Sequence, residues 1–398
     1  MRNAPTTSVP REWDLLLAAS SPDLDSAQPD SDDPGESGLG RIRFLLENPV
    51  DWEAVLRLAD NHGTSSLLYQ SLSRFSDMVP SPVLGALRQR YEKNVYKSLF
   101  LTNELTRILD CLEGLGVEAI PYKGVVLSEV YYGDMALRQT GDIDMFIRRR
   151  DVGRSKNALR DLGYTTRLGI PEELLEDYMA SGYEWTFDGP AGPNLLELQW
   201  ALQPRFYAVD FDMDGMFERV VKVRVAGRSV KTPSPEDLLL VLSVHAAKHV
   251  WGRVILLRDI AQVLKLENLN WDWVWSRARE LGIQRILRVT FLLANRLLGT
   301  GIPVAVERAV LDDEVARVLV DEIVANMAIG VSYDPEQTSY FHLMMRLRER
   351  RADRMRFLAR LVFTPGPGEW ESVRLPKALF PLYRVVRLGR LTSRFVRG

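Results

Sequence analysis

The chain has 398 residues, and its 51 Lys and Arg nearly balance its 53 Asp and Glu, so it lacks the overall basic charge of proteins that coat nucleic acid. Its single cysteine, Cys111, excludes an internal disulfide, and one Cys with four His excludes a zinc cluster of the Cys/His type. No apolar run reaches the ~20 residues of a membrane span, and no signal peptide is predicted. We therefore expect a cytoplasmic protein of two to three domains.

The sequence pattern divides the chain into five regions. Acidic residues among Ser, Pro and Gly between positions 20 and 38 predict disorder at the start. Apolar residues three and four apart then predict helices, including one or two helices over 83–115, and this pattern returns after Pro233 and Pro235. The expected regions are a disordered acidic arm (1–38), an N-terminal helical region (39–113), a mixed α/β core (114–232), a C-terminal helical domain (233–363) and a basic, apolar tail (364–398).

The α/β core contains short β-rich segments separated by Gly, Pro or helix-like inserts. The expected strands cover 117–121, 143–147, 164–167, 183–188 and 195–200. The fold class is therefore expected to be α+β, with a mixed sheet and flanking helices between two helical regions.

Two carboxylates, Asp142 and Asp144, lie at the start of the second predicted strand. Because strand side chains alternate between faces, both point the same way, about 6.6 Å apart along the backbone at ~3.3 Å per residue. Such a pair suits a hard cation such as Mg²⁺, whose shell substrate phosphates usually complete. The alternative is an ordinary turn in which Asp142 is a cap and Asp144 is solvated.

A third carboxylate, Glu197, lies within the apolar run of the last predicted strand. An unpaired charge in such a run is costly to bury, so it needs compensation. If its strand lies beside that of Asp144, Glu197 completes a cluster that a cation or protonation would stabilise. The alternative is a sheet whose Glu197 side faces water.

Upstream, Lys123 and Gly124 follow the first predicted strand and open a helix that runs to about Tyr132. A strand-to-helix turn offers backbone N–H groups to an anion, and Lys123 adds a positive charge for a phosphate. The alternative is a turn that needs Gly124 only for its backbone conformation.

These segments together resemble the uncharacterised bacterial nucleotidyltransferase-like family, which belongs to the DNA polymerase beta nucleotidyltransferase superfamily. The motifs that carry the resemblance are Lys123-Gly124, Tyr131-Tyr132, Arg138, Gly141-Asp142-Ile143-Asp144, the sequence Leu-Arg-Asp-Leu-Gly-Tyr at 159–164, and Leu196-Glu197-Leu198-Gln199-Trp200. Further similar motifs are Pro235-Glu236-Asp237, His245-Ala246-Ala247-Lys248-His249, Arg258-Asp259-Ile260 and the segment from Thr364-Pro365 to Leu375-Pro376. The resemblance covers most of the chain from about residue 42.

The resemblance implies a polymerase-beta-type core in which three carboxylates bind metal and catalyse, and a turn holds the nucleotide phosphates. The implied catalytic and metal-binding residues are Asp142, Asp144 and Glu197. The implied phosphate-binding residues of the core are Lys123, Gly124 and Gly141. Lys123 replaces a small residue, Gln199 stands where relatives commonly have His, and the gap from Gly124 to Asp142 is longer than usual.

Cationic side chains outside the carboxylate motif are further candidates for nucleotide binding. Arg138 is suited to neutralise phosphate charge, and its alternative role is to pin the loop through a salt bridge. Other families of the superfamily imply that Lys248, Arg258 and Asp259 line the nucleotide cleft. The alternative for these three residues is a salt bridge between helices.

The implied reaction is two-metal transfer of NMP from an NTP donor, with Mg²⁺ or Mn²⁺ as cofactor. The acceptor hydroxyl or phosphate is unidentified and belongs to a small molecule, a peptide or protein, or a tRNA. An alternative function is a non-catalytic nucleotide sensor or scaffold. Another is an accessory protein that binds RNA or a membrane through arginines at 346–360 and 384–397.

Overall fold

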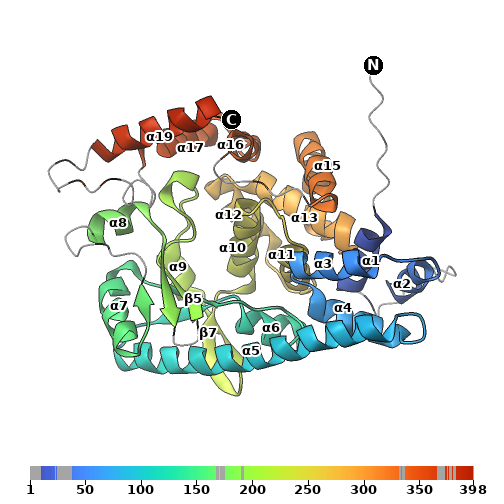
Figure 1. Ribbon diagram of the computed structural model, residues 1–398. Helices are drawn as coiled ribbons and strands as arrows, with labels where there is room; N and C mark the ends of the chain where they lie inside the picture. The colour runs from blue at the N-terminus through green and yellow to red at the C-terminus, as the bar shows by residue number, and fades with distance from the viewer. Residues whose placement is uncertain are drawn as a thin grey trace.

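The structure is a computed structural model that describes residues 10–22, 24, 38–166, 170, 175–189, 192–330, 333, 337–364, 373, 375, 379 and 382–397. A mixed sheet and a long helix occupy one half of the molecule, and helical regions cover the rest (Figure 1). This confirms the expected α+β class. No helix among the described residues is long and apolar enough to cross a membrane.

All five expected strands form one sheet in the order β1-β2-β5-β4-β3. Their bounds are β1 Ala119–Pro121, β2 Ile143–Ile147, β3 Thr165–Thr166, β4 Glu184–Gly189 and β5 Gly192–Gln199. Strands β2 and β5 are parallel, and the other neighbours are antiparallel. The central pair is therefore the pair that carries the predicted carboxylates.

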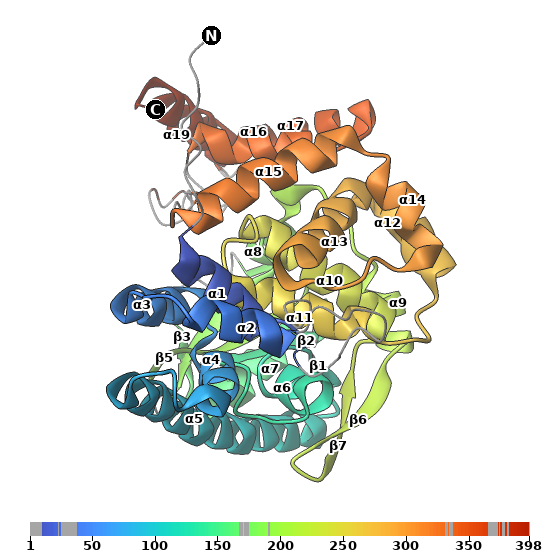
Figure 2. The ribbon, with the colours of Figure 1, turned by 90° about the vertical axis from the view of Figure 1, so that its right-hand side faces the viewer.

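One face of the sheet is an apolar core. Met145 on β2, Trp185 on β4 and Leu198 on β5 are fully buried there. They pack with helices α5 Ser81–Gly114, α7 Val152–Asp161 and α8 Leu175–Ser181. The segment expected to form one or two helices is a single helix, α5, of 34 residues that runs along the bottom of the molecule (Figures 1 and 2).

The opposite face of the sheet meets the helical regions. Tyr122 and Phe146 stack with ring centroids 4.2 Å apart and belong to the same buried cluster as α10 Pro235–Lys248 and α11 Val254–Leu264. Helix α6 Val125–Tyr132 also contacts α11. Polar residues on this face of the sheet are thus placed between strands and helices.

The N-terminal region corrects one prediction. Residues 11–20 are not disordered: they form α1 Arg11–Ser20, in which Trp13, Leu15 and Leu16 are buried. The apolar run 13–19 packs on the other N-terminal helices and on α11 and α13, so it buries enough apolar surface to fold. The remainder of the expected arm, except residues 10, 21, 22, 24 and 38, lies outside the described residues. The neighbouring helices are α2 Gly38–Leu46, α3 Trp52–His62 and α4 Ser65–Leu72.

After residue 233 the described part of the chain is helical, as expected. Just before it, inside the expected α/β core, strands β6 Val221–Val225 and β7 Arg228–Thr232 form a two-stranded hairpin that was not predicted. The remaining helices are α9 Met213–Glu218, α12 Trp271–Leu281, α13 Gln284–Leu298, α14 Val304–Leu311, α15 Glu314–Ala328, α16 Thr338–Arg346, α17 Arg351–Phe363 and α19 Tyr383–Arg397. In Figure 2, α15, α16 and α17 lie along the top of the molecule, opposite α5.

The arginine run at 346–360 forms internal contacts. Six of its seven arginines have partners within the chain: Arg346 with Glu322, Arg348 with the carbonyl of Tyr207, Arg350 with Asp353, Arg354 with the carbonyl of Arg348, Arg356 with Asp353, and Arg360 with Asp210. Arg348 is only 2% exposed, and burial lowers its pKa to about 10. Arg346, Arg348 and Arg360 therefore connect α16, the loop after it and α17 to other parts of the chain, whereas the remaining contacts are local.

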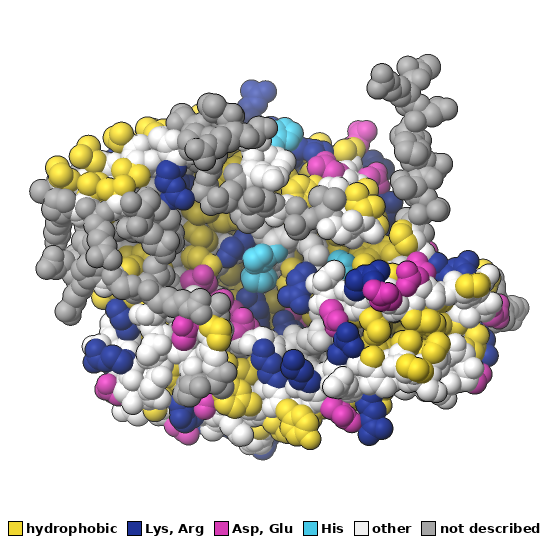
Figure 3. All heavy atoms as spheres, viewed as in Figure 1, with side chains coloured by type: hydrophobic (Ala, Val, Ile, Leu, Met, Phe, Trp, Pro, Cys, Tyr) yellow, Lys and Arg dark blue, Asp and Glu magenta, His cyan; other side chains and the backbone are white. Residues whose placement is uncertain are grey.

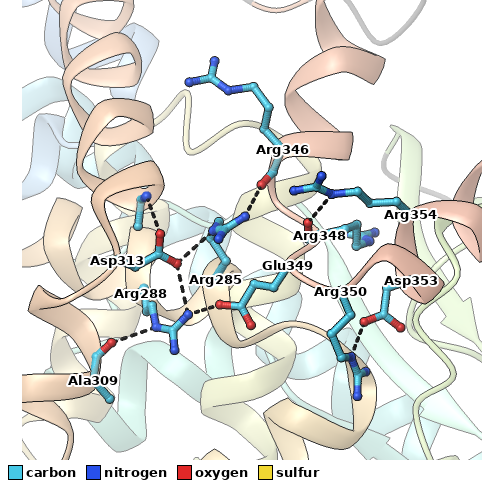
Figure 4. Close-up of polar contacts among 11 residues, drawn as sticks. Arg285, Arg288, Ala309, Asp313, Arg346, Arg348, Glu349, Arg350, Asp353 and Arg354 are labelled. Carbon is cyan, nitrogen blue, oxygen red and sulfur yellow. Dashed lines mark hydrogen bonds and ion pairs between the residues drawn. The ribbon is translucent and has the colours of Figure 1, made fainter.

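Neighbouring arginines on α13 extend this network (Figure 4). Arg285 and Arg288 both donate to Asp313, at 2.8 and 3.0 Å. Arg288 also pairs with Glu349, and Arg285 donates to the carbonyl of Arg346 at 2.9 Å. The partly buried network thus joins α13 to the start of α15 and to the loop after α16.

Candidate active site

Asp144 and Glu197 lie side by side on the two parallel strands. The register of β2 and β5 pairs them directly, so their side chains share one face of the sheet. Asp142 precedes β2 by one residue and is partly buried. The three carboxylates that the sequence singled out therefore belong to one region, and the condition for a joint role of Glu197 is met.

The turn before α6 approaches this region closely. Gly124 has φ +57° and ψ −126°, a conformation that residues with a side chain rarely adopt. A Cβ atom on Gly124 would lie 3.0 Å from the carbonyl oxygen of Asp142 and 3.0 Å from Cγ2 of Thr140. Gly124 is therefore required both by its backbone and by its contact with the Asp142 segment.

Lys123 forms an ion pair within the site. Its Nζ lies 3.1 Å from Oδ1 of Asp144, and the two side chains are 7% and 5% exposed. Nζ also lies 4.9 Å from the ring centroid of Tyr122. Asp144, at the centre of the predicted metal site, is therefore already neutralised by a cation of the chain.

Gln199, which by the resemblance stands in place of a histidine, contacts two side chains of the site. Its Nε2 donates to Glu197 at 3.1 Å, and its Oε1 accepts a hydrogen bond of 2.9 Å from the hydroxyl of Tyr122. Since an amide cannot act as a general base at ordinary pH, Gln199 orients Glu197 instead.

Burial and mutual repulsion perturb the ionisation of the carboxylates. Burial and the charge of Asp144 raise the pKa of Asp142 to about 6. Burial and the charges of Asp144 and Glu184 raise the pKa of Glu197 to about 9. Burial is the largest single effect on Lys123 and lowers its pKa, but Asp144, Tyr122 and Glu197 together outweigh burial and raise that pKa. The site is therefore short of positive charge, and an added cation would be stabilised there.

Helix α10 places cationic and titratable groups over the same face. Lys248 Nζ donates to the hydroxyl of Tyr183 at 2.7 Å and lies 4.5 Å from the centroid of its ring. Burial lowers the pKa of Lys248, and burial together with the charge of Lys123 lowers the pKa of His245. The rings of His245 and His249 contact each other at a tilt, with centroids 4.7 Å apart. The structure thus brings Lys248 to the site, as the resemblance implied.

Arg138 and Asp259 bind one another across the two parts of the site. Arg138 Nε and Nη2 donate to the two Asp259 oxygens at 2.8 and 2.9 Å, and the Tyr132 hydroxyl donates to the same carboxylate at 2.7 Å. Asn94 on α5 donates to the carbonyls of Ala136 and Arg138 and thereby fixes the loop before the carboxylates. This geometry matches the salt-bridge alternative for Arg138, whereas Asp259 pairs with this loop arginine and not with Lys248 or Arg258, as its own alternative expected. Gly141 is exposed at the end of this loop.

Sequence reasoning missed several groups near the carboxylates. Arg253, in the turn between α10 and α11, is exposed, and its charge interacts with those of Arg138, Asp259 and Asp142. This turn contains two consecutive residues with φ +50°, Val250 and Trp251, which is a strained backbone. No sequence pattern indicates positive φ at Val or Trp, so only the structure identifies the turn.

Two further residues, Tyr183 and Glu184, were not singled out as site residues, although they lie in the predicted strand 183–188. Glu184 pairs with Gln199 across β4 and β5. The alternation of Glu184 with buried Trp185 and Phe187 indicates that its strand has a polar face. That alternation, applied to neighbouring strands, would have predicted a continuous polar surface.

The donor set fits a substrate-completed cation site better than a site made by protein alone. Within the described part of the chain, no three His, Cys, Asp or Glu side chains are grouped to hold a metal ion. Mg²⁺ commonly uses one or two carboxylates and completes its shell with water and substrate phosphates. Figure 3 shows His, Lys, Arg and acidic side chains gathered around a hollow in the centre of this face. Asp142, whose pKa burial and the charge of Asp144 raise to about 6, and Asp144 beside it supply the two carboxylates that such a cation uses.

The chain belongs to a family of uncharacterised nucleotidyltransferases. The family model with that description matches residues 48–299, more than half of the chain and all the predicted site residues. This finding confirms the family expected from the motifs and supports a nucleotidyl transfer activity. No curated protein shows a significant match.

Two solved structures show limited similarity. One is the solution structure of the antibiotic-resistance factor ANT(2'')-Ia, which is 13% identical, with a TM-score of 0.34, over 46% of this chain and 91% of that chain. The other is an antigenic nucleotidyltransferase-like protein from Paracoccidioides brasiliensis, 17% identical with a TM-score of 0.27 over 54% of this chain and 97% of that chain.

Proposed function

We propose that this protein is a metal-dependent nucleotidyltransferase that transfers NMP from an NTP to an acceptor hydroxyl or phosphate. The observation that carries the proposal is the direct pairing of Asp144 with Glu197 on parallel strands, beside Asp142. Within a nucleotidyltransferase family, three neighbouring carboxylates that need positive charge favour catalysis over a structural role.

Asp142 and Asp144 would hold Mg²⁺ or Mn²⁺, and Glu197 would lie on the acceptor side. When bound, such ions stabilise the charge of attacking and leaving oxygens in phosphoryl chemistry. Burial and the neighbouring carboxylates raise the pKa of Glu197, so it holds a proton without metal; a bound cation would favour its ionised form, which is the form that would accept the proton of an acceptor hydroxyl. Gln199 holds it in place through the 3.1 Å hydrogen bond.

Two cationic groups of the chain would meet the triphosphate. Lys123 follows β1 beside the Gly124 turn, and Lys248 faces the carboxylates from α10. A lysine ammonium is a compact donor of three hydrogen bonds, and it suits phosphate oxygens. When the nucleotide binds, Lys123 would then either contact both Asp144 and a phosphate or leave Asp144 for the phosphate.

The test is a thermal-shift titration of the full chain with ATP, GTP, CTP and UTP, with and without Mg²⁺ or Mn²⁺. A ligand at 100 times its Kd stabilises a protein by about 2.7 kcal/mol, which is measurable. We expect metal-dependent stabilisation by at least one NTP, lost in the Asp142→Asn/Asp144→Asn variant. Asp161→Asn, which removes an exposed carboxylate on α7, is the control and should retain the effect.

A non-catalytic nucleotide sensor is the second candidate, because Lys123 already neutralises Asp144 without any metal. A pyrophosphate-release assay with mixed acceptor pools separates the two functions. Release that depends on Asp142 and Asp144 supports the transferase. Nucleotide binding that does not depend on metal and is not followed by pyrophosphate release contradicts the transferase and supports the sensor.

A further inference from the structure

Large apolar side chains gather on the surface of the C-terminal helices. Eight of the 19 large hydrophobic side chains that are exposed in the described part of the chain lie between positions 355 and 388. Single exposed apolar residues are normal, whereas a group of this kind marks an interaction site. In Figure 3, hydrophobic side chains form a row along the upper left edge, where Figure 1 shows α17 and α19. The eight residues are Met355, Leu358 and Phe363 on α17, Val373 and Leu379 in the following segment, Leu382 just before α19, and Val385 and Leu388 on α19.

Helix α17 is apolar on both its inner and its outer side. Phe357 and Leu361, four residues apart, are buried on the inner side. Met355 and Phe363 lie on the outer side and are 64% and 56% exposed, and Leu358 between them in sequence is exposed as well. The solvent side of a surface helix is normally polar. The outer side of α17 is therefore suited to contact an apolar partner.

Helix α19 lies beside α17 and also has apolar side chains on its outer side. Arg387 donates to the carbonyl of Leu361 on α17, and its guanidinium carbon lies 5.3 Å from the ring centroid of Phe206. Helix α17 also contacts the short helix η4 Arg205–Tyr207, which contains Phe206. The inner sides of both helices thus face the same part of the chain. Val385, on the outer side of α19, is 61% exposed, so the two apolar outer sides lie next to one another.

Positive charge borders this apolar surface. Helix α19 contains five arginines and no acidic residue, and Arg384 near its start is exposed. Arg351, one helical turn before Met355, is exposed at the start of α17. Neither Arg351 nor Arg384 has an acidic partner among the described residues, and the single acidic residue of α17, Asp353, is buried and paired within the chain. The charge of this surface therefore favours a negatively charged partner.

Three kinds of partner differ in how well they match an apolar surface bordered by arginines. Nucleic acid would supply phosphates to the arginines but would leave Met355, Phe363 and Val385 in water. A second copy of the chain in a two-fold contact would place the same arginines against one another. A bilayer with anionic lipids provides an apolar layer directly below negatively charged headgroups, so it matches both features.

We propose that the outer sides of α17 and α19, which we call the C-terminal face, bind the surface of an anionic phospholipid bilayer. Met355, Phe363 and Val385 enter the boundary between headgroups and acyl chains, and Arg351 and Arg384 contact the headgroup phosphates. The proposal is independent of nucleotidyl transfer, because none of the proposed active-site residues lies on the C-terminal face.

The test is co-sedimentation of the full chain with vesicles of phosphatidylcholine, alone or with about one third phosphatidylglycerol. We expect binding to the vesicles that contain phosphatidylglycerol and a loss of this binding in high salt, which screens the attraction. Met355→Ser/Val385→Ser should raise the apparent Kd about tenfold or more, because two apolar side chains no longer leave water. Tyr96→Ser/Leu99→Ser removes two exposed apolar side chains of α5, on the opposite side of the molecule, and should bind as the wild type does.

A second pair of variants tests the contribution of charge. Arg351→Gln/Arg384→Gln should raise the apparent Kd at least about fivefold and should reduce the salt dependence, because each arginine near an anionic surface adds attraction. Arg57→Gln/Arg88→Gln removes two exposed arginines of α3 and α5 and is the matched control. Circular dichroism of each variant verifies that it is folded.

Several outcomes would overturn the proposal. They are no binding of the wild type to either kind of vesicle, equal binding to both kinds, and equal losses in a control variant. A dimer in sedimentation equilibrium that Met355→Ser/Val385→Ser disrupts, without vesicle binding, would assign the C-terminal face to a second copy. Binding of a single-stranded oligonucleotide in place of vesicles, lost in Arg351→Gln/Arg384→Gln, would assign it to nucleic acid. Either assignment contradicts a bilayer as the partner.

Discussion

Lys123 Nζ lies 3.1 Å from Asp144 Oδ1 inside the protein, where both side chains are more than nine-tenths buried. The ammonium therefore stands against a carboxylate that is expected to bind metal. A buried charge without its partner is unstable, so removal of either group leaves the other uncompensated. Under the proposed function, binding of a cation at Asp144 and binding of phosphate by Lys123 would be linked, because each one would free the other partner.

The first prediction concerns this pair. Asp144→Asn and Lys123→Met should each destabilise the chain by about 3–5 kcal/mol, because each leaves one buried charge uncompensated. The double variant should lose less unfolding free energy than the sum of the losses of the two single variants. Urea unfolding in EDTA measures all three free energies.

Magnesium separates the two single variants. In Lys123→Met the cation replaces the lost ammonium and restores stability, whereas in Asp144→Asn it has no carboxylate to bind there. Equal responses of both variants to Mg²⁺, or additive losses in the double variant, would contradict the pairing and its link to the metal.

The second prediction compares the glycines at the two ends of α6. Gly124 and Gly133 have φ of +57° and +69°, but only Gly124 has atoms within 4 Å of an added Cβ. Gly133→Ala should cost about 1 kcal/mol from backbone strain alone. Gly124→Ala should cost more, about 2–4 kcal/mol, and should also weaken nucleotide binding because it pushes on the Asp142 carbonyl.

Thermal unfolding and NTP titration of both variants test this difference. If Gly133→Ala impaired nucleotide binding as much as Gly124→Ala, the effect would come from the helix and not from the close approach to Asp142. Equal losses of stability would mean that the contact with Asp142 and Thr140 relaxes without cost.

Local sequence patterns predicted the strands and the long helix because both are set by side-chain periodicity. The predicted strand 143–147 coincides with β2, and the pair of Asp142 and Asp144 follows from alternation along one strand. The position of Glu197 beside Asp144 required the register of two strands more than 50 residues apart, which local pattern does not determine.

Other features depended on partners distant in sequence. Arg138 and Asp259 are 121 positions apart, and either residue alone is consistent with a free nucleotide contact. In the same way, α1 lacks a sequence signal strong enough to outweigh its acidic surroundings, and its apolar face is stabilised by α11 and α13. Tertiary burial outweighed local composition there.

The third prediction concerns Arg138 and Asp259 as the link between the carboxylate loop and α11. Asp259→Asn should destabilise the chain by about 3–5 kcal/mol, because it breaks a buried bidentate pair. The combined Arg138→Met/Asp259→Leu variant should recover part of this loss. A double-mutant cycle by urea unfolding gives the coupling energy.

The exposed pair Arg88 and Glu92 on α5 supplies the matched control. Exposed pairs of this kind contribute about 0.3–0.5 kcal/mol. A coupling energy for Arg138 and Asp259 as small as that of the exposed pair would show that the loop is held by other contacts, such as those of Asn94.

The fourth prediction is a pH dependence caused by Glu197. Burial and neighbouring carboxylates raise its pKa from 4.5 to about 9 in the folded chain, so the folded chain keeps a proton that the unfolded chain releases. The stabilisation is complete below about pH 4.5 and is lost as the pH rises toward 9, with a slope of at most about 1.4 kcal/mol per pH unit. Asp142, with a pKa raised from 3.8 to about 6, adds to the loss at the acidic end of this range.

Glu197→Gln isolates this contribution, because glutamine has no proton to lose. The unfolding free energies of the wild type and of Glu197→Gln are measured from pH 5 to 9 in EDTA. The wild type should lose stability relative to Glu197→Gln steadily as the pH rises. Glu267→Gln, an exposed substitution, should run parallel to the wild type. Excess Mg²⁺ should reduce the decline, since a cation stabilises the ionised carboxylates. A pH profile of Glu197→Gln parallel to that of the wild type would mean that Glu197 is ionised and solvated, and its assignment to a carboxylate cluster would then be wrong.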